Sequence, residues 1–165
     1  SAALEKLQAV DCYGGPEAGK HNFYRGGDLK VYHQETVDAL KNLEGRLPVK
    51  LLHEIWDHSI AEVYTGQNVW VHGDIAPGNL LLQNNQFYGI IDFGILGTGD
   101  PACDYAMAWT YFDSESRNIF LKGLSCDMVN RARGWALWKA LITYDDVNPV
   151  FRENARYTIH NIINE

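Results

Sequence analysis

The chain has 165 residues, of which 46% are hydrophobic and 21% are charged, and its formal net charge is −7. This length and composition predict one globular domain with a hydrophobic core, and they exclude a disordered chain. The negative charge argues against a nucleic-acid partner, because phosphate binding needs a basic surface, but it is compatible with a cationic small molecule.

Neither a membrane segment nor a secretion signal is visible in the sequence. No apolar run approaches the roughly 20 residues that cross a bilayer, and the stretch 1–6 lacks a signal-peptide pattern. The cysteines Cys12, Cys103 and Cys126 are odd in number and widely spaced, which favours reduced, mostly buried thiols over a disulfide framework or a zinc site. We therefore expect a cytoplasmic protein without a membrane partner.

The first third of the chain is predicted to be helical around one loop. Residues 1–9 resemble the end of a helix, which suggests a chain that starts inside a larger protein. The glycine-rich stretch 13–28 indicates a loop. Helical patterns follow at 33–45 and 48–63. The apolar residues of the second pattern recur at helical spacing: Leu52, Trp56, Ile60 and Val63.

The middle of the chain changes to short β-strands. Residues 69–71 form one strand candidate, and residues 80–82 and 87–91 flank the turn signal Asn84-Asn85, which predicts a β-hairpin. After this hairpin the pattern is helical again, with helices expected at 101–112, 115–123, 127–144 and 149–163. The predicted fold class is therefore α+β, mostly α.

Three oxygen-bearing side chains are expected to converge at one end of the hairpin. Asn79 opens its first strand, Asp92 closes its second, and only four residues separate Asp74 from Asn79. Pairing across the turn sets Asn79 opposite a residue between positions 90 and 92, so the side chains of Asn79 and Asp92 can lie within ~7 Å of each other.

This set of side chains suits a hard cation and a proton acceptor. Mg²⁺ commonly takes one or two carboxylates together with substrate phosphates, so Asn79 and Asp92 are candidate metal ligands. Asp74 then remains free to orient and deprotonate a hydroxyl. Protein kinases divide these tasks in the same way, with a catalytic loop H-R-D-x-x-x-x-N and a metal-binding Asp before Phe-Gly. In this chain glycine replaces the arginine, in His72-Gly73-Asp74.

Each half of this pattern has an ordinary explanation when it is taken alone. An isolated Asp-Phe-Gly is more often a turn than a metal site, and an isolated His-Gly-Asp is an equally weak signal. Finding both in order, with the Asn correctly spaced, favours a functional interpretation of Asp74, Asn79 and Asp92. For His72 a structural role, in which hydrogen bonds hold the loop, is favoured over proton transfer.

Three motifs follow one another within residues 69–112: His72-Gly73-Asp74 with Asn79, Ile91-Asp92-Phe93-Gly94, and Gly99-Asp100-Pro101 with Asp104-Tyr105-Ala106-Met107-Ala108-Trp109. Together they resemble the aminoglycoside phosphotransferase and choline-kinase-like superfamily, and the flanks 24–29 and 133–140 resemble it more loosely. The resemblance implies a bilobal protein-kinase-like fold, ATP with Mg²⁺ as the phosphoryl donor, and a small acceptor with a hydroxyl group. It also implies Asp74 as the base, and Asn79 and Asp92 as the magnesium ligands.

Asp104 is the one acidic residue of a helix that is otherwise apolar. Asp100 is a good N-cap and Pro101 a favourable first residue, so the helix should begin there and be buried. An unpaired buried carboxylate is costly, so Asp104 should accept hydrogen bonds. The resemblance suggests that backbone groups near the catalytic loop donate them, which makes Asp104 a support of the site rather than a reactant.

The superfamily also has an N-terminal lobe, whose strand lysine contacts the ATP phosphates. No five-stranded pattern precedes residue 69, so residues 1–165 are expected to be the C-terminal lobe alone, with the catalytic loop and metal-binding hairpin at 69–94. No ATP-contacting residue is assigned within it. Residues 14–20 match the start of a P-loop, but His21 replaces the Ser or Thr that binds Mg²⁺, and the preceding segment is helical rather than a strand.

The leading functional hypothesis is ATP-dependent phosphotransfer to a hydroxyl of a small molecule, with the isolated lobe expected to be inactive. A binding module or pseudokinase without chemistry is the alternative. A metal-dependent hydrolase is disfavoured, because two-metal centres gather more Asp and His ligands.

The acceptor site is expected in the helical region, but the sequence does not single out its residues. Trp135 and Trp138 lie at helical spacing and are predicted to belong to the core. A cationic acceptor would need several carboxylates around it, and each candidate is equally compatible with an ordinary surface charge. These candidates are Asp57, Glu62, Asp113, Glu115, Asp145 and Asp146.

Overall fold

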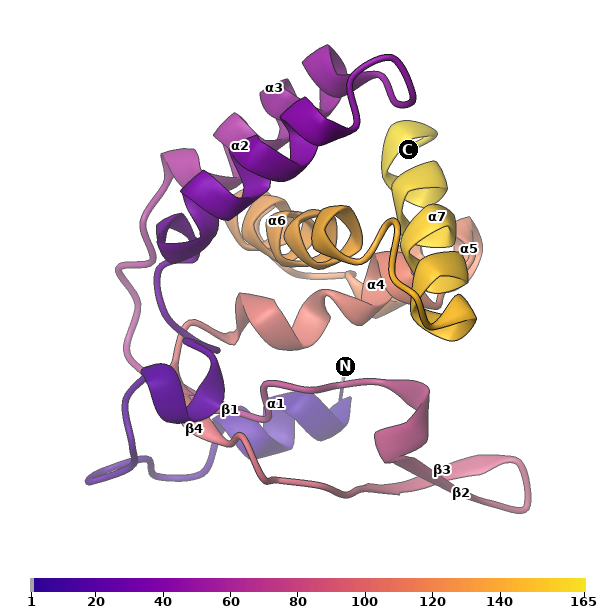
Figure 1. Ribbon diagram of the computed structural model, residues 1–165. Coiled ribbons are helices and arrows are strands. Elements are labelled where there is room, and N and C mark those ends of the chain that lie inside the picture. The colour runs from indigo at the N-terminus through magenta and orange to yellow at the C-terminus, as the bar shows by residue number, and fades with distance from the viewer. Residues whose placement is uncertain (1) are drawn as a thin grey trace.

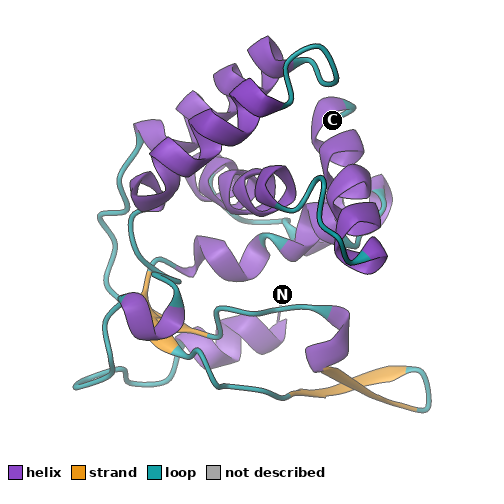
Figure 2. Ribbon diagram, in the orientation of Figure 1, coloured by secondary structure: helices purple, strands orange, loops and turns teal. Residues whose placement is uncertain are grey.

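A helical body stands above two small antiparallel sheets in the computed structural model, which describes residues 2–165 (Figures 1 and 2). Its α-helices are α1 Ala2–Gln8, α2 His33–Asn42, α3 Val49–Ala61, α4 Met107–Thr110, α5 Ser114–Phe120, α6 Cys126–Ile142 and α7 Pro149–Ile163. Its 3-10 helices are η1 Lys20–Asn22, η2 Leu29–Tyr32, η3 Pro77–Asn79 and η4 Pro101–Tyr105. Its strands are β1 Val69–Val71, β2 Leu80–Gln83, β3 Gln86–Ile90 and β4 Gly97–Gly99. The predicted α+β class, mostly α, is confirmed.

Helix α6 is the centre of the helical body and packs against α2, α3, α7 and η4 (Figure 1). Gly134 permits this close packing, because a Cβ atom at that position would stand 2.5 Å from the side chains of both Leu29 and Ser59. Trp135 and Trp138 of α6 are both buried, so the prediction that they belong to the core is confirmed.

The hairpin β2–β3 forms where the sequence predicts it. Leu80 pairs with Ile90, and the chain reverses at Asn84 and Asn85, which both adopt positive φ angles of 53° and 59°. Two successive left-handed residues form the turn that matches the twist of a two-residue hairpin, and asparagine tolerates this conformation well.

The second sheet, β1–β4, is predicted only in its first strand. Val69 pairs with Gly99 and Val71 with Gly97, so the partners come from distant parts of the chain. The sequence Gly-Thr-Gly of β4 has little intrinsic preference for a strand. Its pairing depends on burial instead, since all three residues are buried.

Two predicted helices differ from the structure. α3 ends at Ala61, so Val63, which was expected on its buried face, is 52% exposed. The helix predicted at 101–112 is divided into η4 and α4, although the predicted start is correct, because the Asp100 side chain accepts a hydrogen bond from the backbone N–H of Ala102. Helix α7 has the predicted limits, and the other predicted helices agree to within a few residues.

The cysteines and the P-loop-like stretch have ordinary surroundings. All three cysteines are free, but Cys103 alone is buried, while Cys12 is partly buried and Cys126 is exposed, so the expectation of mostly buried thiols is wrong. A true P-loop follows a strand, but the segment before residues 14–20 contains the helix α1. Within residues 2–165, no helix has both the length and the apolar character needed to cross a bilayer.

Candidate active site

The segment after β1 is held in place by a buried carboxylate. The backbone N–H groups of His72 and Gly73 donate hydrogen bonds to the two oxygens of Asp104, at 2.8 and 2.7 Å. Asp104 lies in η4 and is fully buried. Because both oxygens are used, the loop that leads to Asp74 has a fixed orientation relative to the core. This is the hydrogen bonding that the resemblance implies for Asp104.

Burial also changes the acidity of this carboxylate. Removal from water raises the pKa of Asp104 from 3.8 to about 6, although the N–H groups of Gly73 and His72 favour the ionised form and oppose the rise. Asp104 is therefore ionised at neutral pH but takes up a proton in mildly acidic solution.

His72 connects the Asp74 segment to the Asp92 segment. The Nδ1 atom accepts a hydrogen bond from the backbone N–H of Asp74 at 3.2 Å, so the proton is assigned to Nε2, which lies 2.9 Å from the carbonyl oxygen of Ile91. The ring is fully buried and packs edge-on against Phe93 at 4.8 Å. Both ring nitrogens are engaged within the protein, which supports a structural role for His72.

The side chain of Asn79 fixes Asp74. Its Nδ2 atom donates to the carbonyl oxygen of Asp74 at 2.8 Å and to the Oδ2 atom of Asp74 at 3.2 Å. Both partners are acceptors, so the amide orientation is determined and the Oδ1 atom of Asn79 is turned away from them. Asp74 is exposed, and one of its carboxylate oxygens can still accept a hydrogen bond from a substrate.

Asp92 lies beside Asn79 because the hairpin pairing continues past the strands. The backbone N–H of Ile91 donates to the carbonyl oxygen of Asn79 at 2.9 Å, so Asn79 is opposite residue 91, within the expected range of 90 to 92. Asp92 itself has a positive φ of 64° and is exposed. The structure thus brings Asp74, Asn79 and Asp92 to the same end of the hairpin.

These oxygen atoms fit a magnesium ion. The carboxylate of Asp92 is exposed and the Oδ1 atom of Asn79 is not used by Asp74, so two hard oxygen ligands are available, as Mg²⁺ commonly uses. Among the described residues, no group of three or more His, Cys, Asp and Glu side chains could hold a metal ion. This observation gives no support to a two-metal hydrolase centre.

A cleft of about 220 Å³ opens beside Asp74, between the catalytic loop and helices α4, α6 and α7. Its wall includes Arg25, Trp135 and Lys139. Neither Asn79 nor Asp92 lines it, and none of the six acidic residues considered from the sequence does so. Sequence reasoning missed Arg25 and Lys139 as site residues. The only signal was their place in the loosely similar flanks 24–29 and 133–140.

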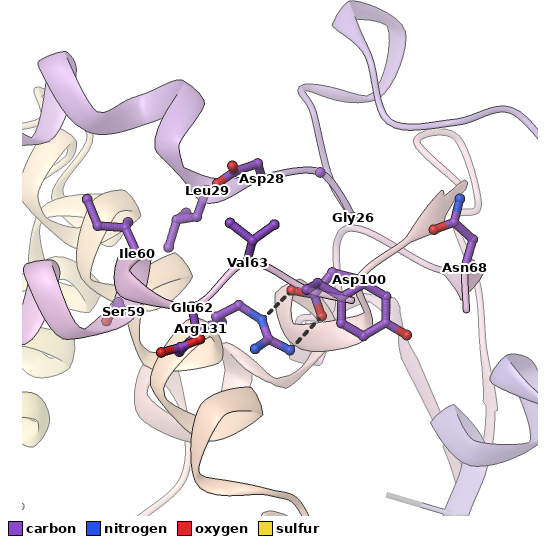
Figure 3. A pocket seen from close by; sticks show the side chains of 12 residues that line it. Gly26, Asp28, Leu29, Ser59, Ile60, Glu62, Val63, Asn68, Asp100 and Arg131 are labelled. Atoms are coloured by element: carbon purple, nitrogen blue, oxygen red, sulfur yellow. Dashed lines mark hydrogen bonds and ion pairs between the residues drawn. The ribbon is translucent and has the colours of Figure 1, made fainter. Parts of the chain in front are cut away.

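A second cavity, of about 160 Å³, contains a structural ion pair (Figure 3). The Nε atom of Arg131 lies 2.7 Å from the Oδ2 atom of Asp100, and both side chains are largely buried. Asp100 also caps η4, which carries Asp104. This ion pair therefore helps to fix the support of the catalytic loop.

Comparisons with known proteins agree with this geometry. The model of the family described as Phosphotransferase enzyme family (APH) matches residues 2–140. No curated protein sequence matches the chain. Among solved structures, the chain is similar to the macrolide 2'-phosphotransferase MphH from Brachybacterium faecium, with 20% identity and a TM-score of 0.54 over 94% of this chain and 56% of that one.

Two aminoglycoside phosphotransferases are similar to a comparable degree. ADP-bound APH(2'')-Ib is 18% identical, with a TM-score of 0.50 over 96% of this chain and 60% of that one. APH(2'')-IIa in its ternary complex with streptomycin and ATP is 20% identical, with a TM-score of 0.50 over 90% and 56%. The chain therefore spans less than two thirds of the length of these structures, and the likeness establishes a shared fold.

Proposed function

This chain belongs to the phosphotransferase enzyme family, and we propose that it transfers the terminal phosphoryl group of ATP to a hydroxyl of a small molecule. The single observation that carries the proposal is the convergence of Asp74, Asn79 and Asp92, with the Asn79 amide bonded to Asp74 and the hairpin setting Asp92 beside Asn79. The ADP and ATP in two of the similar structures support ATP as the donor.

In the proposed reaction, Asp74 acts as the base. Asn79 holds one of its carboxylate oxygens, and the other accepts the proton of the acceptor hydroxyl. The acceptor oxygen then forms a bond to the terminal phosphorus of ATP, and the bond from that phosphorus to the bridging oxygen breaks with its electron pair on ADP. Asp104 and His72 do not react; they keep the Asp74 segment in position.

Asn79 and Asp92 are the proposed magnesium ligands. A magnesium ion at these oxygens would neutralise charge on the phosphates during transfer. The exposure of Asp92 is compatible with this role, because Mg²⁺ keeps part of its coordination shell for water and phosphate oxygens.

We assign residues 1–165 to the C-terminal lobe of a kinase-like phosphotransferase, with the catalytic loop and metal-binding hairpin at 69–94. The share of the similar structures that the chain spans, 56–60%, supports this assignment. The proposed partner is an N-terminal lobe that holds the ATP phosphates, so the chain alone should be inactive. The three free cysteines support the cytoplasm as the compartment of the reaction.

The alternative is a binding module or pseudokinase that has the cleft but performs no chemistry. The intact set of Asp74, Asn79 and Asp92 favours the enzyme. Calorimetry of the isolated chain with ATP and Mg²⁺ examines the assignment of the lobe, since tight binding would show that the donor site lies within this chain.

A phosphorylation screen tests the proposed function. The protein with both lobes is incubated with ATP, Mg²⁺ and a panel of amino sugars, macrolides, sugar acids and small alcohols, and ADP release and new phosphoesters are measured. Asp74→Asn should lower kcat by roughly 10²–10⁴-fold, the usual contribution of a positioned base. Asp57→Asn, an exposed position on α3 outside the cleft, is the control. Unchanged turnover in Asp74→Asn would show that Asp74 is not the base.

A further inference from the structure

The cleft beside Asp74 has a charge opposite to that of the protein. The chain has a formal net charge of −7, but the cleft is lined by the cations Arg25 and Lys139 and by one carboxylate, that of Asp74. None of the six acidic residues considered for a cationic acceptor lines the cleft, and two of them are engaged elsewhere. Asp145 pairs with Arg46, and Asp113 caps α5.

Arg25 is held against the catalytic loop by Gly73. A Cβ atom at Gly73 would stand 3.0 Å from the Cβ atom of Arg25 and 3.1 Å from its Cγ atom, so the aliphatic part of Arg25 occupies the space that a side chain would need. Gly73 also has a positive φ of 83°. The guanidinium carbon lies 5.0 Å from the ring centroids of both Trp135 and Trp138, which fixes its position by cation–π contact.

Within the described chain, Arg25 has no anionic partner. Its Nε atom is buried and has no hydrogen-bond acceptor, and the ion pairs of the structure do not include it. A cation that is partly removed from water is costly unless an anion accompanies it, and the two aromatic rings offset only part of that cost.

Lys139 is the second cation that lines the cleft, and its side chain is more exposed than that of Arg25. Partial burial of the ammonium group lowers the pKa of Lys139, and repulsion from Arg25 lowers it further, while Asp74 opposes this shift. The two cations are thus close enough to repel each other across the cleft. An anion between them would relieve the repulsion and could accept hydrogen bonds from the terminal N–H groups of Arg25, which are not among the buried atoms.

We infer that the acceptor is a small hydroxylated acid, whose carboxylate contacts Arg25 and Lys139 while its hydroxyl faces Asp74. This inference rests on the proposed function and specifies its substrate class. The cations lie on the acceptor side of Asp74, because the proposed metal ligands Asn79 and Asp92 do not line the cleft. The volume of about 220 Å³ is below the roughly 300–1,000 Å³ of sites for drug-sized ligands, so a single sugar acid is a suitable size.

Three sugars of one ring size test the charge preference. D-Glucuronate, D-glucose and D-glucosamine are titrated into the protein without nucleotide, and binding is followed by the NMR signals of the indole N–H groups of Trp135 and Trp138. Glucuronate should bind about tenfold or more tightly than glucosamine, because it alone brings charge-assisted hydrogen bonds to the two cations. The preference should weaken in roughly 1 M NaCl, where the Debye length is about 3 Å.

Variants of the two cations provide the second part of the test. Lys139→Met, at an exposed position, and Arg25→Met should each reduce the preference for glucuronate, whereas Arg46→Met, which removes an exposed cation outside the cleft, should leave it unchanged. If Arg25→Met does not fold, Arg25→Lys, which keeps the charge but loses the planar donor group, replaces it.

Equal or tighter binding of glucosamine would overturn the inference, as would a preference for glucuronate that survives loss of both cations. The outcome is independent of the proposed chemistry. Binding of glucuronate without phosphorylation of any compound of the acceptor panel contradicts the proposed function and not the charge of the cleft. Asp74-dependent phosphorylation of glucosamine in preference to glucuronate contradicts the charge assignment and not the proposed function.

Discussion

The two antiparallel sheets of this protein have opposite relations to the core. Sheet β1–β4 lies beneath the helical body, and every residue of β4 is buried, whereas the hairpin β2–β3 projects from the body with most of its residues exposed (Figure 2). The catalytic loop connects the two. Asp74 follows strand β1, which ends on the buried residue Val71, while Asn79 and Asp92 flank the exposed hairpin.

This difference indicates two separate origins for the geometry of the site. The position of Asp74, the proposed base, is set by the core, through Asp104 and the backbone N–H groups of His72 and Gly73. The positions of Asn79 and Asp92, the proposed metal ligands, are set by local pairing within the hairpin. Substitutions behind the buried sheet should therefore affect the free energy of unfolding, and substitutions at the hairpin should affect activity alone.

The largest loss of stability is expected from the ion pair behind β4. Arg131→Met leaves the carboxylate of Asp100 buried without its cation, so the free energy of unfolding should fall by about 3–5 kcal/mol. Arg46→Met removes a similar pair with Asp145 at an exposed site, and it should have a much smaller effect. Urea denaturation measures both variants. Equal losses of stability in the two variants would show that the buried ion pair near β4 contributes no more than the exposed one.

A pair of glycines compares the two sheets directly. Gly99 of β4 has a φ of 155°, and a Cβ atom there would collide with the backbone oxygen of Gly26, so Gly99→Ala should cost about 3 kcal/mol. Gly89 of β3 has free space around it, so Gly89→Ala should leave stability unchanged or slightly higher. Thermal unfolding measures both variants. A large loss of stability in Gly89→Ala would contradict the proposed difference in packing between the two sheets.

Asp104 should make stability depend on pH. Its pKa in the folded protein, about 6, lies above the ordinary value of 3.8, so the folded chain binds a proton more tightly than the unfolded chain does. This contribution favours folding at low pH and is lost as the pH rises from about 4 to 6. The difference between the two pKa values corresponds to a change in the free energy of unfolding of roughly 3 kcal/mol at most.

Urea denaturation of the wild type and of Asp104→Asn between pH 4 and pH 7 isolates this effect. The free energy of unfolding of the wild type minus that of the variant should decrease as the pH rises, because only the wild type titrates at this position. A difference that is flat or that increases with pH would contradict the raised pKa of Asp104.

The smallest effect on stability is expected at the exposed end of the hairpin. Asp92 is exposed at a positive φ of 64°, a conformation that asparagine adopts readily, so Asp92→Asn should change the free energy of unfolding by less than about 0.5 kcal/mol. In the protein with both lobes, the same variant should lose most of the proposed phosphotransfer activity, and higher Mg²⁺ concentrations should restore part of it. Loss of folding together with activity would show that Asp92 is a structural residue.

The sequence predicts the features that local interactions determine. The turn at Asn84-Asn85 sets the hairpin pairing to within one residue. Regular pairing from this turn would put Asn79 opposite residue 90, and a bulge between Leu81 and Leu82 moves it to residue 91. The cap at Asp100 likewise marks the start of η4. Each of these features depends on residues close together in the chain, so a pattern of residue types is sufficient.

Features that depend on distant contacts were not predictable. Strand β4 has no apolar periodicity, and its pairing with β1 goes with the burial of all three β4 residues. Arg25 and Lys139 belong to no strong motif and lie 114 positions apart in the chain, and the fold brings both to the same cleft. The sequence allowed a cationic acceptor from the overall charge, whereas the charge of the cleft depends on which few side chains the fold places there.

The central claim is that Asn79 and Asp92 hold one divalent cation beside the proposed base Asp74. Mn²⁺ replaces Mg²⁺ in such sites and broadens the NMR signals of nearby nuclei, so it can be added to the ¹⁵N-labelled protein in the presence of ADP. The account predicts selective broadening of the amide signals of these three residues, with those of α2 unchanged, and loss of the effect in Asp92→Asn. Broadening centred on another part of the chain, or broadening that persists in Asp92→Asn, would contradict it.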